Sequence, residues 1–210
     1  MEGRRQTRGE ELANALSHGV GLVAAVAAIP VLVVAAARRG DAAAVVGASI
    51  FGASMALLYL TSTLYHAAPP GNAKGWLRRL DHCAIFLLIA GTYTPFTLGV
   101  LRGGWGWGLF GAVWGLALVG IGHKLAAGIR WPRLSTALYV AMGWLVIVAI
   151  GPLVTRVPAP GIALLVAGGL AYTGGVAFYA RPDARYAHFV WHLFVLAGTT
   201  LHFFAVLRYA

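Results

Sequence analysis

Residues 186–207, YAHFVWHLFVLAGTTLHFFAVL, contain no side chain of Asp, Glu, Lys or Arg and are apolar over most of their length. A helix needs about 20 such residues to cross the hydrocarbon core of a bilayer, so this stretch predicts a transmembrane helix. Comparable runs, separated by short charged loops, fill the rest of the chain. We therefore predict an all-α membrane protein, a bundle of seven transmembrane helices that forms one domain over residues 1–210. The approximate spans are 12–37, 43–66, 82–101, 105–123, 134–154, 160–180 and 187–207.

The composition also indicates that lipid is the solvent of this chain. Of its 210 residues, 60% are hydrophobic and 10% are charged, which is too few charges for the surface of a soluble domain. The net charge of +10 does not indicate a nucleic-acid partner, because the basic residues stand singly or in short clusters between apolar runs. Cys83 is the only cysteine, which excludes an intrachain disulfide.

The basic residues predict how the bundle is oriented. Cytoplasmic loops of membrane proteins carry an excess of Lys and Arg. With a cytoplasmic N-terminus and an outside C-terminus, the inner segments hold 11 basic residues and the outer segments 5. The inner ones are Arg4, Arg5, Arg8, Lys74, Arg78, Arg79, Lys124, Arg130, Arg133, Arg181 and Arg185, and the outer ones are Arg38, Arg39, Arg102, Arg156 and Arg208. Removal of span 105–123, the weakest because of its glycines, would change the balance to 8 against 8, so the rule favours seven spans.

Most of the histidines gather at one face in this topology. Six of the seven fall toward the cytoplasmic side: His18, His66, His82, His123, His188 and His192. His188 and His192 are four residues apart, which places them on one helix face and one turn apart. Two imidazoles in this arrangement can bind one metal ion, although they can equally be two hydrogen-bonded histidines of the core.

A third imidazole at the same depth favours the metal. His66 ends the second span, and three nitrogens with a vacant fourth position are typical of catalytic zinc, whose bound water ionises near neutral pH. Asp81 could be the base for that water, and Ser62, one turn before His66, could orient a ligand or the substrate. The alternatives are that Asp81 pairs with Arg78 or Arg79, and that Ser62 bonds a carbonyl of its own helix.

The other polar residues of the spans have less definite roles. His82 follows Asp81 and points about 100° away from it, so it is the next choice as a ligand. Glu11, Asn14 and His18 form a polar stripe that is expected to face the bundle, as a support for the metal site, a gate or packing. His202 lies about 15 Å along the helix from His192, too far for a Zn–N bond of about 2 Å, and is expected at a membrane interface.

Several motifs together resemble the hemolysin III proteins of bacteria, within the progestin and adipoQ receptor group that includes the adiponectin receptors. They are Glu11-x-x-Asn14 with Ser17-His18, Ser62-x-x-x-His66, Leu80-Asp81-His82, Gly91-Thr92-Tyr93-Thr94-Pro95, and His188-x-x-x-His192 with a later His202. The resemblance implies a seven-helix bundle with zinc held by His66, His188 and His192 and with Asp81 near the zinc-bound water. The chain has no counterpart of the soluble N-terminal domain of the eukaryotic receptors, so a protein hormone is not expected as its ligand.

Two classes of function follow from these features. The first is a zinc-dependent hydrolase of a lipid amide, similar to a ceramidase, which acts on membrane lipid or fatty-acyl substrates in lipid homeostasis in the inner membrane of a bacterium. The second is a non-enzymatic membrane protein, either a sensor of lipid state or a pore-former. The pore ranks lower, because the outer half of the bundle offers few polar side chains beyond the hydroxyls of the third span.

Overall fold

The computed structural model describes residues 4–210, and within this range it is helical with no β-strand. If α5, the short 3-10 helix η1 and α6 are counted as one interrupted helix, these residues form seven helical segments. The bounds are α1 Arg8–Arg38, α2 Ala42–Ala67, α3 Asn72–Leu98, α4 Gly104–Ala127, α5 Pro132–Gly143, η1 Leu145–Ala149, α6 Ile150–Arg156, α7 Ala159–Tyr179 and α8 Ala187–Tyr209.

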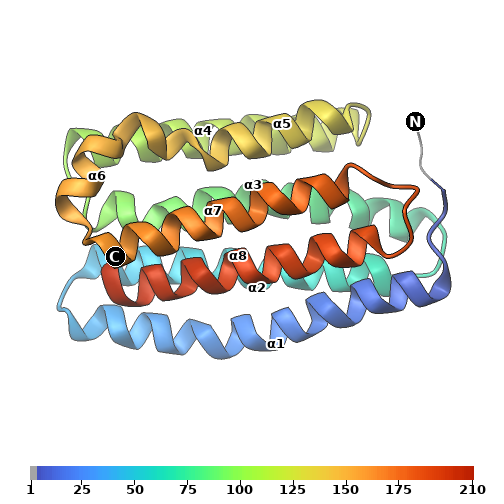
Figure 1. The fold of residues 1–210 in the computed structure, drawn as a ribbon, viewed down its shortest axis with the longest axis horizontal. Helices are drawn as coiled ribbons and strands as arrows, with labels where there is room; N and C mark the ends of the chain where they lie inside the picture. The colour runs from blue at the N-terminus through green and yellow to red at the C-terminus, as the bar shows by residue number, and fades with distance from the viewer. Residues whose placement is uncertain (1–3) are drawn as a thin grey trace.

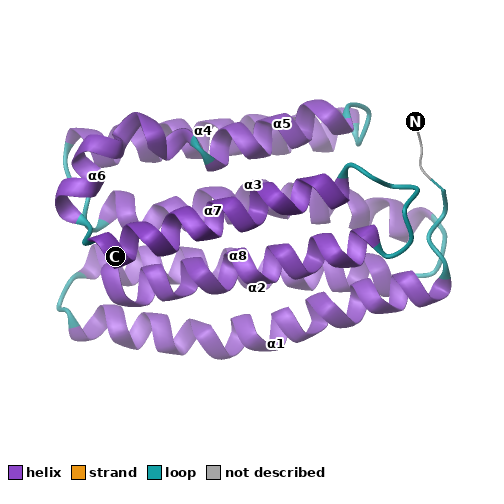
Figure 2. Ribbon diagram, viewed as in Figure 1, coloured by secondary structure: helices purple, strands orange, loops and turns teal. Residues whose placement is uncertain are grey.

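The long helices run side by side along the longest axis of the molecule and are joined by short loops (Figures 1 and 2). The chain enters at one end of the bundle and its C-terminus lies at the other. The start of α1, the end of α2 and the starts of α3 and α8 come together at the entry end, here called the N-terminal end of the bundle. This arrangement brings segments that are far apart in the sequence to one place.

The helices have the length and composition of membrane spans. Within the described chain, six segments are long and apolar enough to cross a bilayer, namely α1, α2, α4, the interrupted α5–α6 segment, α7 and α8. Their outer faces are apolar, as Val23 on α1 and Val119 on α4 illustrate, each with a side chain that is 72% exposed. Exposed aliphatic surface of this extent needs lipid around it, so the chain is a multi-pass membrane protein.

Helix α3 is the one long helix that falls short of this apolar composition. It packs against α2, α4, α5 and α8, and many of its polar side chains, among them Asp81, Thr92 and Thr94, are buried. A helix enclosed by other helices meets little lipid, so it tolerates polar residues that would be unfavourable on a lipid-facing helix.

Most of the predicted bounds agree with the observed helices within a few residues, but two differ. Helix α3 begins at Asn72, ten residues before the expected 82, because charged residues such as Lys74 end an apolar run without ending a helix. The predicted span 134–154 is interrupted after Gly143 by η1. Pro152 explains the interruption, since proline cannot bond the carbonyl four residues before it and is tolerated in the first turn of the new helix α6.

Tyr93 of α3 binds the backbone where α5 is interrupted. Its hydroxyl proton is shared between the carbonyl oxygens of Met142 and Gly143, each 2.8 Å from the hydroxyl oxygen. The same oxygen accepts a hydrogen bond of 2.9 Å from the backbone N–H of Val146. Unpaired backbone groups are costly inside a membrane, so this side chain compensates for the helical bonds that α5 lacks at this point.

We expect Tyr93→Phe to lower the free energy of unfolding by about 1–3 kcal/mol, because it leaves buried backbone groups without their partner. Reversible unfolding in mixed detergent micelles, followed by circular dichroism, measures this change. Tyr65→Phe is the control, since the Tyr65 hydroxyl makes no hydrogen bond to any residue in the described part of the chain. Equal stability of the two variants would contradict the assignment.

Candidate metal centre

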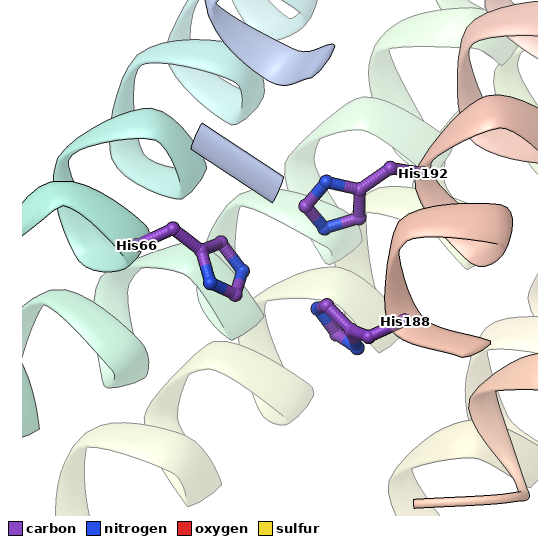
Figure 3. Close-up of side chains that lie close together, drawn as sticks. All are labelled: His66, His188 and His192. Carbon is purple, nitrogen blue, oxygen red and sulfur yellow. The ribbon is translucent and has the colours of Figure 1, made fainter. Parts of the chain in front are cut away.

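Three histidines from two helices converge at the N-terminal end of the bundle. His66 comes from the last turn of α2, and His188 and His192 come from the first two turns of α8. Figure 3 shows their rings pointing into a common space between the helices. One ring nitrogen from each lies within 4.8 Å of the corresponding nitrogens of the other two. We call these three residues the histidine cluster.

Helix α1 determines which nitrogen of His66 faces the cluster. His66 Nδ1 lies 2.7 Å from Glu11 Oε2, and because a carboxylate only accepts, Nδ1 carries the proton and donates it. Lys74 binds the other oxygen of Glu11 at 2.9 Å, which holds the carboxylate in place. His66 Nε2 therefore has a free lone pair, and it is buried without a hydrogen-bond partner among residues 4–210.

His192 is held in the same manner by the next turn of α1. Its Nδ1 lies 3.3 Å from the carbonyl oxygen of Asn14 and 3.1 Å from Ser17 Oγ. Ser17 donates its own proton to the Asn14 carbonyl at 2.9 Å, so Nδ1–H of His192 is the donor to both oxygens. Nε2 of His192, like Nε2 of His66, is left as the acceptor nitrogen that a metal ion can bind.

A cavity of about 130 Å³ extends from the histidine cluster into the bundle. His188, His192, Ser62 and Asp81 line it near the N-terminal end of the bundle, and His202 lines it farther along α8. Most of the remaining wall consists of aliphatic and aromatic side chains from α3, α5, α7 and α8. A site of this shape suits a molecule with one polar group and an apolar tail.

The two predicted catalytic residues both reach this cavity. Asp81 is buried and forms no ion pair with any described residue, so the alternative that it pairs with Arg78 or Arg79 is wrong. Ser62 lies against the Asp81 carboxyl group. Its hydroxyl forms no bond to its own helix and is without a hydrogen-bond partner in the part of the chain that the structure describes. Both polar groups are thus available to a ligand.

The remaining histidines lie outside the cluster. His82 lines the cavity with its Nδ1 unbonded to any of residues 4–210, and His123 stacks on Trp131 with ring centroids 5.3 Å apart. His202 is separate from the cluster, as predicted, and its expected position at a membrane interface stays a prediction. The residue is 8% exposed between α7 and α8, and its Nε2 donates to the carbonyl oxygen of Leu165 at 3.2 Å.

The sequence did not single out Ser17 as a partner of His192, or Lys74 as a partner of Glu11. Both contacts join segments that are distant in the chain, such as residues 17 and 192. The available signal was the spacing of Glu11, Asn14 and His18, which indicated one polar face of α1 but not the helix that this face meets.

The donor set fits a first-row transition metal such as zinc. Neutral imidazole nitrogens bind zinc at about 2.0–2.1 Å, and such ligands usually donate their other N–H to a carboxylate or a carbonyl. Glu11 and the Asn14 carbonyl are acceptors of these two kinds. Since two nitrogens on one zinc ion lie at most about 4 Å apart, metal binding would require the three rings to move slightly closer together.

The fold and this cluster define an all-helical, multi-pass membrane protein with a potential three-histidine metal site. The chain belongs to the haemolysin-III related family, whose sequence model matches residues 6–203. It is 46% identical over 200 residues to Hemolysin-3 of Bacillus cereus, an alignment that covers 95% of this chain and 91% of that protein. The identity to the Hemolysin-3 homolog of Bacillus subtilis (strain 168) is also 46%, over 95% of this chain and 94% of the relative.

A more distant relative is found in animals. The human Monocyte to macrophage differentiation factor is 26% identical over 212 residues, which cover 95% of this chain and 84% of that protein. These matches confirm the resemblance that the motifs indicated, to hemolysin III proteins within the progestin and adipoQ receptor group.

We expect the purified protein to retain about one zinc ion per chain, and His66→Ala and His192→Ala to lose it, because two imidazoles bind zinc far more weakly than three. Elemental analysis after dialysis against a weak chelator measures the content. His123→Ala and His202→Ala remove imidazoles outside the cluster and should keep the metal. Full zinc content in both cluster variants would contradict the site.

Glu11→Gln should weaken metal affinity by roughly 10–100-fold, because the carboxylate that orients the His66 ring and raises its basicity is lost. Competition with a fluorescent zinc chelator gives the affinity. Asp41→Asn removes a carboxylate that pairs with Arg102 at the opposite end of the bundle and should leave the affinity unchanged. An unaltered affinity in Glu11→Gln would show that Glu11 does not support the site.

Proposed function

We propose that this protein is a zinc-dependent hydrolase of a lipid amide, similar to a ceramidase, which acts in membrane lipid homeostasis in the bacterial inner membrane. The observation that carries the proposal is the cavity that joins the histidine cluster and Asp81 to an apolar interior. The cluster would hold the polar, reacting end of the substrate, and the interior would hold its acyl chain.

The proposal includes a seven-span topology with a cytoplasmic N-terminus. The excess of basic residues on the N-terminal side of the bundle supports it, as does the position of the two chain ends at opposite ends of the bundle (Figure 1). In this topology α3, the third helix along the chain, also crosses the membrane and brings the six apolar spans to seven. The histidine cluster then lies near the inner leaflet, at a depth where the amide group of a membrane lipid can reach it.

The length of the cavity suits one acyl chain, but its volume of about 130 Å³ does not, so the surrounding helices would have to move apart for a whole chain to enter. On α3 the lining extends from Asp81 to Tyr93, which is about 18 Å at 1.5 Å per residue. An extended hydrocarbon with C–C bonds of about 1.5 Å advances by roughly 1.25 Å per carbon, so a chain of roughly 14 carbons matches this length. Transfer of such a chain between bilayer and cavity leaves it in apolar surroundings, while the amide group gains polar partners.

The polar groups at the cluster supply the remaining requirements of amide hydrolysis. His66, His188 and His192 would hold a zinc ion, which would supply polarisation of the carbonyl group and a bound water of lowered pKa. Asp81 accepts a proton from the attacking water as its oxygen adds to the carbonyl carbon. When the C–N bond breaks, Asp81 returns this proton to the nitrogen, and the products are a fatty acid and an amine. Ser62, beside Asp81, orients the carboxyl group or the substrate.

We expect Asp81→Asn to lower the rate of fatty-acid release by at least about 100-fold while zinc content stays unchanged, because an amide cannot accept the proton. The assay uses the purified, zinc-loaded protein in lipid nanodiscs with a panel of amide and ester lipids, and detects fatty acid by mass spectrometry. Asp41→Asn serves as the control for the loss of one carboxylate.

Failure of the hydrolase proposal has a clear signature in the same assay. The proposal fails if the protein releases no fatty acid from any lipid of the panel and His66→Ala behaves like the wild type. The sensor and pore alternatives would then be tested directly. Single-channel recording in liposomes separates the two, because a pore conducts ions and a sensor does not.

A further inference from the structure

His18 stands apart from the other histidines at the N-terminal end of the bundle. Its side chain is on α1, 3% exposed, and its ring lies parallel to that of His192, with centroids 3.5 Å apart and an angle of 7° between the planes. The ring of Tyr59 meets it edge-on at 5.0 Å. Neither ring nitrogen of His18 has a hydrogen-bond partner among residues 4–210.

An imidazole always carries at least one N–H, in its neutral form as well as in its charged form. His18 therefore has a buried donor that no described protein group accepts, which is unfavourable by itself. His66 and His192 on the same end of the bundle show the contrast, since α1 pairs the Nδ1–H of each. A donor left unpaired beside such a well-paired arrangement indicates an acceptor that is not part of the protein.

The position of His18 shows where this acceptor would lie. His18 lines the same cavity as Asp81, Ser62 and His188. His18 covers the face of the His192 ring and does not lie beside the ring edge that carries Nε2, so it is not placed as a further ligand. It is placed beside the space that the reacting group of a substrate would occupy.

We propose that His18 is a substrate-binding catalytic residue that donates a hydrogen bond to the carbonyl oxygen of the acyl group held at the histidine cluster. This inference rests on the proposed hydrolase function and deepens it. As water adds to the carbonyl carbon, negative charge develops on that oxygen, and a donor fixed in advance in a dry site stabilises it more than the neutral substrate. The stack on His192 and the edge contact with Tyr59 fix the orientation of the donor.

The experiment separates this role from packing alone by comparing two substitutions. His18→Phe keeps a flat ring for the stack and removes the N–H, and His18→Gln keeps a donor and removes the ring. The readout is the affinity of the cobalt-substituted protein for acetohydroxamate, whose oxygens bind the metal, measured by visible absorption. It requires no turnover, so it reports on His18 even if the protein hydrolyses no lipid.

We expect both variants to bind one metal per chain. His18→Phe should bind acetohydroxamate about 10-fold to 100-fold more weakly, the effect of one hydrogen bond to a charged oxygen, and His18→Gln should stay within a few-fold of the wild type. His123→Phe is the matched control, because His123 also stacks on an aromatic ring at this end of the bundle.

Two outcomes would overturn the inference. If His18→Phe binds acetohydroxamate as tightly as the wild type, His18 only stacks on His192 and donates no hydrogen bond to a ligand. If His18→Phe loses the metal, His18 supports the metal itself. Should the aromatic variant fail to fold, His18→Met and His18→Gln, which are matched in length, give the same comparison.

Discussion

The structure depends on how α1 accepts hydrogen bonds from the Nδ1–H groups of two buried histidines, His66 and His192. An imidazole in a low-dielectric interior is unfavourable unless each polar atom has a partner, and water is scarce between packed helices. Glu11 accepts from His66, and the carbonyl of Asn14 with Ser17 accepts from His192. These bonds hold α2 and α8 to α1 and also turn the free nitrogens toward one point. The same hydrogen bonds therefore pack the helices together and orient the histidine cluster.

The start of α1 is itself fixed by a polar network. Thr7 and Glu10 form a reciprocal cap on the first turn, and Glu10 also pairs with Arg4. Glu10 Oε1 accepts a hydrogen bond of 2.9 Å from the backbone N–H of Tyr186, the residue before α8. Tyr186 has a φ of 57°, a conformation uncommon for a residue with a side chain, and this bond helps to hold it. One carboxylate thus sets the relative height of α1 and α8, and with it the depth of His192 relative to Asn14.

The sequence predicts the parts of this structure that lipid and helical geometry impose. Long apolar runs predict most of the helices. The four-residue spacing of His188 and His192 and the depth of His66 predict the cluster, because the depth of a residue in a membrane can be inferred from its distance to the nearest charged loop. The rotation of each helix about its axis cannot be inferred from the distance to a charged loop. The stack of His18 on His192 and the contact of Ser17 with His192 depend on that rotation. The backbone groups at the interruption after Gly143 are paired by Tyr93, about 50 residues earlier, and this partner has no local signal in the sequence.

The N-terminal residues lie near the histidine cluster and the C-terminus lies far from it, and this difference decides where a purification tag can be placed. Residues 4–7 run over the site end of the bundle, where Arg4 binds Asp183 and Gln6 accepts a hydrogen bond of 2.6 Å from the Asn14 side chain. An oligohistidine purification tag fused before these residues would place extra imidazoles close to the histidine cluster, where they would compete with it for a metal ion. Ala210 is at the far end of the molecule (Figure 1), although its carbonyl oxygen accepts from Arg39. A tag joined there through a flexible linker keeps affinity chromatography and metal analysis independent of each other.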